Sequence, residues 1–289
     1  MNKIKLSHGS LAFLLAVISS LVIQFLGALF LANLTDDAYD VASYVLMAVL
    51  QGANIVIALL IFKKTGVEKE EILLPVKTKT AGKSALVLIV TLISSYMLVV
   101  WINLALERFG VRTGSIRVDG YFFILALIVT GILAPIGEEI VYRFILLSGL
   151  REKFSPFTSI CLSAFAFAFM HFNPYQTVYQ IVFGIVLGLV VTKSGNIAYS
   201  IIMHALNNVI VLLLALLPSF DGYLVSHGAL LCLAIMLFVV GMVVVFFIFR
   251  SKDRKKEPSV NYNKRKEGFV FYLIAFSICL LMWALNFMV

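Results

Sequence analysis

Five ionisable side chains stand in stretches of the sequence that are otherwise apolar. Glu138 and Glu139 are adjacent, and Arg143 follows four residues after Glu139, while His171 and His204 lie in later apolar segments. Ionisable residues inside membrane segments are rare and energetically costly, and by default they mark functional sites. Carboxylates, a cation and imidazoles in such a setting are suited to proton transfer in catalysis.

The chemistry that these residue types could carry out is hydrolysis of a peptide bond. A carboxylate in an apolar cavity is suited to act as a general base near neutral pH, and we assign this role to Glu138. His171 would share the attacking water and carry its proton to the leaving amine. His204 and Asn208 would donate hydrogen bonds to the developing oxyanion, a kind of contact whose loss typically slows a reaction by ~100–1000-fold.

The two adjacent carboxylates are expected to have different roles. Glu139 and Arg143 are four residues apart and share one helical face, with the acid on the favoured N-terminal side. Glu138 points about 100° away from that face. We therefore expect Glu139 to neutralise Arg143 and Glu138 to face a cavity. Pro135 removes one helical hydrogen bond just upstream, so a kink there would open space beside Glu138.

Glu138 and His171 are predicted to lie at the same depth in the membrane. The polar turn from Arg151 to Pro156 joins two apolar segments, and Glu138 precedes Arg151 by 13 residues while His171 follows Pro156 by 15. At ~1.5 Å per residue, both side chains are roughly 20–22 Å from the turn. An antiparallel helix pair would hold them level, which predicts one shared site.

A third polar group comes from His204 and Asn208, which are four residues apart and again share one helical face. Asn207 lies one step round the helix and is a weaker alternative donor. His204 is only about 12 Å along the helix from its preceding loop, so its depth matches that of Glu138 less well. We expect helix tilt or a projecting loop to absorb the difference.

Together these residues form three short motifs in a fixed order. The motifs are Glu138-Glu139-x-x-x-Arg143, Phe167-x-x-x-His171 and His204-x-x-x-Asn208. In order, rough spacing and placement within membrane helices, they resemble the motifs of the CAAX-protease and bacteriocin-processing (CPBP, or Abi) family of intramembrane proteases. That family also contains the Ras-converting CAAX prenyl endopeptidases.

The resemblance covers residues 130–212 and departs from the family pattern at Phe144, where a glycine commonly follows the motif arginine. It implies an intramembrane peptidase in which the first glutamate and the FxxxH histidine activate water. It also implies that the third motif stabilises the oxyanion. Phe167 would line the pocket beside His171, with Glu139 and Arg143 as supporting residues.

Metal dependence is a separate question. Glu138, His171 and His204 would make a His₂Glu zinc set with one open position, and the family is often described as metalloprotease-like. The sequence has no HExxH motif and no obvious fourth strong ligand. Since a glutamate and a histidine can act on water directly, we favour a metal-free site, with zinc as the alternative.

Two other functions fit parts of the pattern. A Glu–Arg pair and buried histidines also serve as structural contacts in transporters and channels, but transporters tend to show internal repeats or paired broken helices, and none is apparent. The second alternative is a non-catalytic membrane scaffold that gives immunity to a peptide toxin, since some relatives are linked to bacteriocin self-protection. An immunity phenotype would survive mutation of Glu138, whereas protease activity would not.

The elements that must position these residues are membrane helices. The chain is 62% hydrophobic and 13% charged, with a mean hydropathy of +1.03, whereas soluble domains are nearer half apolar and a quarter charged. Apolar segments long enough to cross ~30 Å of hydrocarbon recur throughout. The predicted fold is an all-α polytopic bundle of about nine transmembrane helices, with eight as the near alternative. The predicted helices are residues 10–33, 41–62, 82–106, 121–149, 155–172, 174–192, 196–217, 225–250 and 268–287.

Lysine and arginine predict the orientation of these helices. With a cytoplasmic N-terminus and nine spans, 19 of the 23 basic residues fall in cytoplasmic segments and three fall outside, as the positive-inside rule requires. The +8 net charge therefore reflects topology, which argues against nucleic-acid binding. We expect an integral protein of a bacterial plasma membrane with its C-terminus outside. Its partners would be the lipid bilayer and a peptide or protein substrate with a membrane-associated segment.

The predicted organisation has three parts. Residues 1–120 hold the first three helices, residues 121–217 form the catalytic core, and residues 218–289 hold the last two helices. A basic loop, residues 251–267, precedes the final helix and is expected to be cytoplasmic.

Overall fold

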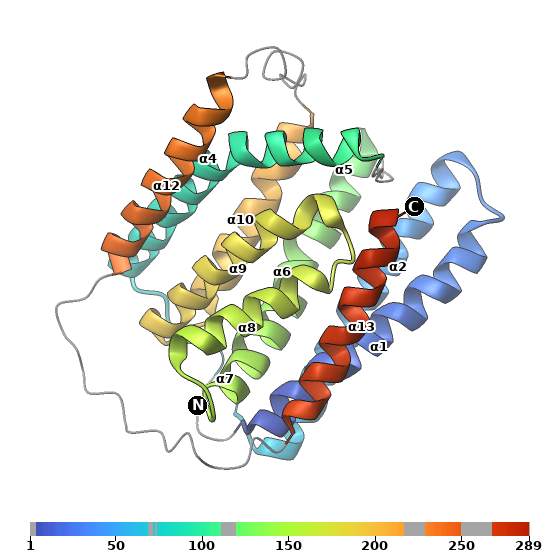
Figure 1. The fold of residues 1–289 in the computed structure, drawn as a ribbon. Helices are drawn as coiled ribbons and strands as arrows, with labels where there is room; N and C mark the ends of the chain where they lie inside the picture. The colour runs from blue at the N-terminus through green and yellow to red at the C-terminus, as the bar shows by residue number, and fades with distance from the viewer. Residues whose placement is uncertain are drawn as a thin grey trace.

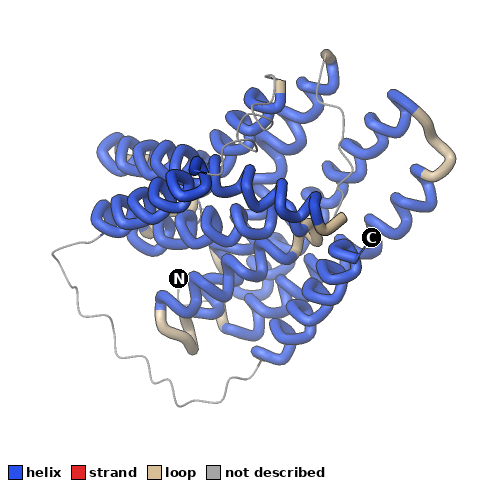
Figure 2. Tube along the Cα trace, turned by 45° about the horizontal axis from the view of Figure 1, so that its top comes forward, coloured by secondary structure: helices blue, strands red, loops and turns tan. Residues whose placement is uncertain are grey.

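The structure described is a computed structural model. It describes residues 4–68, 72, 74–110, 120–216, 229–249 and 268–288. Within these residues every regular element is a helix and no strand is present. Figure 2 shows that short loops join most of the neighbouring helices in this part of the chain. The prediction of an all-α polytopic membrane bundle is confirmed.

The predicted helical segments are all present in the described residues, with boundaries that differ by at most five residues. The elements are α1 (Leu6–Leu31), α2 (Asp36–Thr65), α4 (Thr78–Arg108), α5 (Tyr121–Ala126), η1 (Leu127–Leu133), α6 (Ala134–Glu139), η2 (Ile140–Leu146), α7 (Leu147–Leu150), α8 (Pro156–Phe169), α9 (Pro174–Ser194), α10 (Ala198–Ala215), α12 (Ala229–Phe249) and α13 (Phe269–Met288). The elements from α5 to α7 form one continuous helical segment, within which η1 and η2 are wider π-helical turns.

Seven of these helical segments are long and apolar enough to cross a membrane: α1, α2, α4, the α5–α7 segment, α9, α10 and α13. The helix predicted over residues 155–172 is shorter than expected. With 14 residues, α8 covers about 21 Å of a ~30 Å hydrocarbon core. It ends early because Asn173 and Pro174 start a new helix. A proline disfavours the α conformation of the residue that precedes it. A helix of this length that starts at the membrane surface would place the turn between α8 and α9 within the depth of the membrane.

The helices are arranged in three groups, as Figure 1 shows. The paired helices α4 and α12 pack along one side, and α1, α2 and α13 form the opposite side. The segment from α6 to α10 lies between them. Helix α4 contacts α9 and α10, while α1 and α2 contact η2. The helices that carry the three motifs are thus enclosed from both sides.

Glycines allow close contacts between helices in the bundle. A Cβ atom on Gly149 would lie 2.8 Å from the Lys5 carbonyl oxygen and 3.1 Å from the Gly9 Cα, so α1 and α7 approach backbone to backbone. On α9, a Cβ on Gly188 would lie 2.9 Å from the Ile160 side chain of α8. The GxxxG pattern of Gly184 and Gly188 therefore serves packing inside the bundle, as the small-residue rule for membrane helices predicts.

Several segments predicted to be cytoplasmic meet at one end of the bundle. The Leu6 N–H donates to Glu152 Oε2 at 2.7 Å, and the Asn196 amide donates to the Leu74 carbonyl at 3.0 Å. Gly268 lies against Ser7 at the same end. This grouping agrees with the predicted alternation of spans. The side of the membrane that this end faces stays a prediction, and the basic loop 251–267 lies outside the described residues.

Candidate active site

Glu139 lies at the centre of a buried charged cluster. Its Oε1 lies 2.9 Å from His204 Nδ1, and its Oε2 lies 3.5 Å from Arg143 Nε. The side chains of Glu139 and Arg143 have no exposed surface. The expected pairing of Glu139 with Arg143 is therefore present, but Glu139 also holds His204, a contact that the sequence did not predict.

Among the described residues, the Arg143 guanidinium has its ion pair with Glu139 and no hydrogen-bond partner, and it packs against an aromatic ring. Its Cζ lies 4.3 Å from the centre of the Phe167 ring, which is a favourable cation–π distance. A Cβ on Gly184 would lie 3.3 Å from Nη2, so glycine at this position leaves room for the guanidinium. Phe167 thus contributes a ring face to the cation, and it also contacts the ring of His204.

Glu138 faces a different set of partners, and its side chain is 13% exposed. Its Oε1 accepts a hydrogen bond of 3.0 Å from the amide of Gln51 on α2, and its Oε2 lies 3.8 Å from His204 Nε2. Since a carboxylate only accepts, His204 donates through Nδ1 to Glu139 and directs Nε2 toward Glu138. The two adjacent carboxylates thus hold opposite edges of one imidazole.

His171 stands in the turn after α8 rather than on the helix. Its backbone N–H bonds the Ala168 carbonyl at 3.4 Å, so the Phe167 carbonyl is free to accept from the His171 ring at 2.8 Å. The Phe167 ring also packs edge-on against the His171 ring, with centroids 5.0 Å apart, so the four-residue spacing brings both the carbonyl and the ring of Phe167 to His171. Because a carbonyl only accepts, Nδ1 carries the hydrogen and Nε2 of the neutral ring is an acceptor. His171 also has an electrostatic interaction with Glu138.

The turn that carries His171 has its backbone polar groups bonded by side chains, as an irregular segment at membrane depth requires. Asn286 of α13 donates to the Phe172 carbonyl at 2.7 Å, and the Asn173 side chain accepts from the Tyr175 N–H at 3.0 Å. Phe172 has a positive φ of 52°, which is uncommon for a residue with a side chain. Helix α13 therefore helps to fix the conformation of this turn.

Pro135 and Asn208 together explain the irregular backbone before the carboxylates. In η1 the helix is wide enough that the Ala134 N–H bonds the carbonyl of Val129, five residues earlier. Pro135 has no N–H, so the next carbonyl in this series, that of Thr130, lacks a helical donor. Asn208 takes its place and donates to Thr130 O at 2.7 Å. The expected kink at Pro135 thus takes the form of wide turns around α6.

Asn207 and Asn208 have different surroundings on α10. Asn207 is buried and accepts a hydrogen bond from the Tyr179 hydroxyl, and its amide donates to Asn208 Oδ1 at 3.2 Å. An amide nitrogen carries two hydrogens. Asn208 uses one of them in its hydrogen bond to the Thr130 carbonyl, and the other is left for a substrate oxygen. Asn208 is therefore both a structural contact for η1 and a candidate donor.

The structure brings Glu138, Glu139 and His204 into contact. His171 interacts electrostatically with Glu138, whereas Asn208 bonds Thr130 and Asn207. The expected depth mismatch of His204 is absent, because its ring packs edge-on against Phe167 and Phe183 and reaches both carboxylates. Sequence reasoning missed Gln51. The available signal was Gln51 and Asn54, two polar residues three apart in an apolar segment, where side chains of this kind are costly to bury.

The zinc alternative concerns Glu138, His171 and His204. Within the described part of the chain, no group of three or more His, Cys, Asp and Glu side chains could hold a metal ion. The Nδ1 atoms of His204 and His171 bind Glu139 and the Phe167 carbonyl, and metal-binding histidines usually hold their second ring nitrogen in this way. Metal dependence stays a prediction, which metal analysis and activity after chelator treatment would test.

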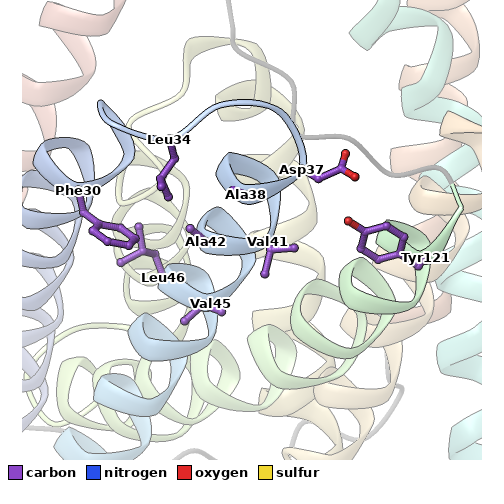
Figure 3. Close-up of a pocket in the computed structure, with 9 residues that line it drawn as sticks. All are labelled: Phe30, Leu34, Asp37, Ala38, Val41, Ala42, Val45, Leu46 and Tyr121. Atoms are coloured by element: carbon purple, nitrogen blue, oxygen red, sulfur yellow. The ribbon is translucent and has the colours of Figure 1, made fainter.

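A groove of about 550 Å³ lies elsewhere, where α1, α2 and α5 meet (Figure 3). Seven of its nine lining residues are apolar, and Figure 3 shows the Asp37 carboxylate and the Tyr121 hydroxyl facing one another at one side. None of its lining residues belongs to the charged cluster. The groove and the candidate site are therefore separate features.

Comparison with known proteins agrees with the three motifs. Residues 120–210 match the model of a family described as type II CAAX prenyl endopeptidase Rce1-like. No curated protein and no solved structure gives a significant match. The match includes all three motifs and confirms the predicted resemblance. The part of this membrane protein from α5 to α10 is thus similar to the Rce1-like CAAX prenyl endopeptidases.

Proposed function

We propose that this protein is an intramembrane endopeptidase that hydrolyses a peptide bond near or within the membrane. The observation that carries the proposal is the environment of Glu138. This carboxylate is partly accessible, lies on a membrane helix, and has an amide donor on one oxygen and an imidazole near the other. Similarity to a peptidase family over residues 120–210 supports the same function.

In the proposed reaction, Glu138 is the general base. It takes one proton from water while the water oxygen attacks the peptide carbonyl carbon. Nε2 of His171 is an acceptor in the tautomer that its bond to Phe167 favours, so it can share the same water. The peptide C–N bond then breaks, and the proton passes to the leaving amine. The products are one new carboxyl terminus and one new amino terminus.

The developing oxyanion is met by the third motif. His204 would donate from Nε2 while Glu139 holds Nδ1, and Asn208 would use the amide hydrogen that does not bind Thr130. In this state the ring is an imidazolium. Its charge would balance the cluster, in which two carboxylates face one guanidinium. Fixed donors aimed at an oxyanion are usually a large contribution to catalysis.

The proposed substrate is a peptide or protein with a membrane-associated segment. The proposed setting is a bacterial plasma membrane, with the N-terminus in the cytoplasm and the C-terminus outside. The distribution of lysine and arginine along the chain supports this orientation. Reporter fusions at the two termini would test it.

Comparative proteomics would test the function. Cells would carry the wild type, Glu138→Ala, or Glu107→Ala as a matched control from the exposed end of α4. We expect new peptide termini that are present with the wild type and Glu107→Ala and absent with Glu138→Ala. Processing that persists with Glu138→Ala at normal protein levels would contradict the proposal. A toxin-immunity phenotype that survives Glu138→Ala would instead favour a non-catalytic scaffold.

A further inference from the structure

A side chain from outside the family-matched segment reaches the proposed base. Gln51 lies on α2, is buried, and donates from Nε2 to Glu138 Oε1 at 3.0 Å. We propose that Gln51 is a positioning residue that fixes the orientation of the Glu138 carboxylate. This inference rests on the proposed function, and it implies that the catalytic site is incomplete without α2.

The orientation of the Gln51 side-chain amide is fixed by hydrogen bonds at both of its ends. A carboxylate can only accept, so the nitrogen of Gln51 must face Glu138. The Asn54 amide donates to Gln51 Oε1 at 3.1 Å, which holds the opposite end of the same group. Asn54, Gln51 and Glu138 therefore form a hydrogen-bonded chain with a single direction. Asn54 is also buried, so this chain is sheltered from competing donors.

This arrangement gives the two oxygens of the Glu138 carboxylate different roles. Oε1 of Glu138 is held by Gln51, while Oε2 lies 3.8 Å from His204 Nε2 and is left to accept a proton from water. Without the amide, the carboxylate could rotate between orientations, and only a fraction of them would aim at the water. Correct orientation of a catalytic group is a major part of enzymatic rate enhancement.

The packing of α2 against α6 is shaped around this contact. A Cβ on Gly137, the residue before Glu138, would lie 2.7 Å from Gln51 Oε1 and 3.3 Å from the Gln51 carbonyl oxygen. Glycine therefore permits Gln51 to approach. If α2 served only to pack here, an apolar side chain would fill the space without burying polar atoms.

The test compares Gln51→Met with Gln24→Met. Methionine is close to glutamine in shape and cannot donate, and Gln24 is a matched control because its amide bonds Ser20 on α1, at 2.8 Å. The substrate is a synthetic peptide that spans a Glu138-dependent cleavage site from the proteomic comparison. We expect Gln51→Met to lower kcat roughly ten-fold, about 1.4 kcal/mol, with KM unchanged. Gln24→Met should leave both constants unchanged.

Two further variants separate positioning from folding. Asn54→Leu should lower kcat less than Gln51→Met does, because it removes only the hydrogen bond to Gln51 Oε1. It also tests the positioning role if the Gln51→Met protein does not accumulate. In a Glu138→Ala background, Gln51→Met should cause no further loss, since residues that act as a unit are not additive. A rise in KM at constant kcat, or kcat within twofold of wild type for Gln51→Met and Asn54→Leu, would overturn the inference. If Glu138→Ala itself remains active, the proposed function fails as well.

Discussion

The charged cluster around Glu139 is buried and polar, whereas the groove between α1, α2 and α5 is exposed and apolar. In the cluster, Glu139 and Arg143 are fully buried. In the groove, Phe30 and Val45 are 58% and 56% exposed, and the volume is about 550 Å³. In soluble proteins the largest apolar pocket is a reasonable first guess for a site. In a membrane protein, lipid can fill such a groove, so desolvated charge is the better guide.

The largest expected effect is on catalysis at the cluster. Glu138→Ala and His171→Ala should each lower kcat/KM roughly 100- to 10,000-fold, the usual range for a general base. If both residues act on one water, the kcat/KM of the double variant should be only slightly lower than that of the less active single variant. Steady-state cleavage of a peptide substrate would measure this. Independent, multiplicative losses would contradict a shared water.

The second effect is on stability. Arg143→Ala leaves Glu139 buried without its cation, and breaking a buried ion pair typically costs about 3–5 kcal/mol. Thermal unfolding in detergent should show a large fall in midpoint. Replacing both partners, as Glu139→Leu with Arg143→Met, should recover much of the stability but not activity, because His204 loses its acceptor. Full activity in this double variant would break the proposed link between Glu139 and His204.

A smaller effect is expected where α13 supports the His171 turn. Asn286→Ala removes the hydrogen bond to the Phe172 carbonyl, and such a bond contributes about 1 kcal/mol. We expect a modest loss of stability and a few-fold loss of activity. Asn33→Ala is the matched control, because Asn33 bonds the Leu29 carbonyl far from the cluster. Equal activity losses in the two variants would argue against a specific role for α13.

The smallest effect is expected in the groove. Val41→Trp places a large side chain in it, and exposed substitutions away from special features usually change stability by less than about 0.5 kcal/mol. Peptide cleavage should remain within about twofold of wild type. A loss comparable to that of Glu138→Ala would show that the groove is part of the catalytic site, and the contrast between the two regions would fail.

Local geometry made part of this site predictable. The ion pair between Glu139 and Arg143 follows from four-residue helical spacing, and the apolar runs gave all the helical segments in the described residues. The end of α8 was also encoded, since Asn173 and Pro174 favour a new helix start, but hydropathy alone extended the helix past it.

Contacts between distant segments were less predictable. The contacts of His204 with both carboxylates depend on the π-helical turns around α6 and on how α10 packs. Neither feature follows from a repeating pattern in the sequence. Gln51 lies 87 residues before Glu138. Its polarity was visible in an otherwise apolar helix, but its partner depends on the packing of α2 against α6.

Isotope labelling tests whether Glu138 activates water for peptide hydrolysis. Purified wild type and Glu138→Ala would be incubated with the peptide substrate in ¹⁸O-enriched water, and the products would be analysed by mass spectrometry. We expect new carboxyl termini that carry ¹⁸O with the wild type and no such product above background with Glu138→Ala. Labelled product from Glu138→Ala at the wild-type rate would contradict it.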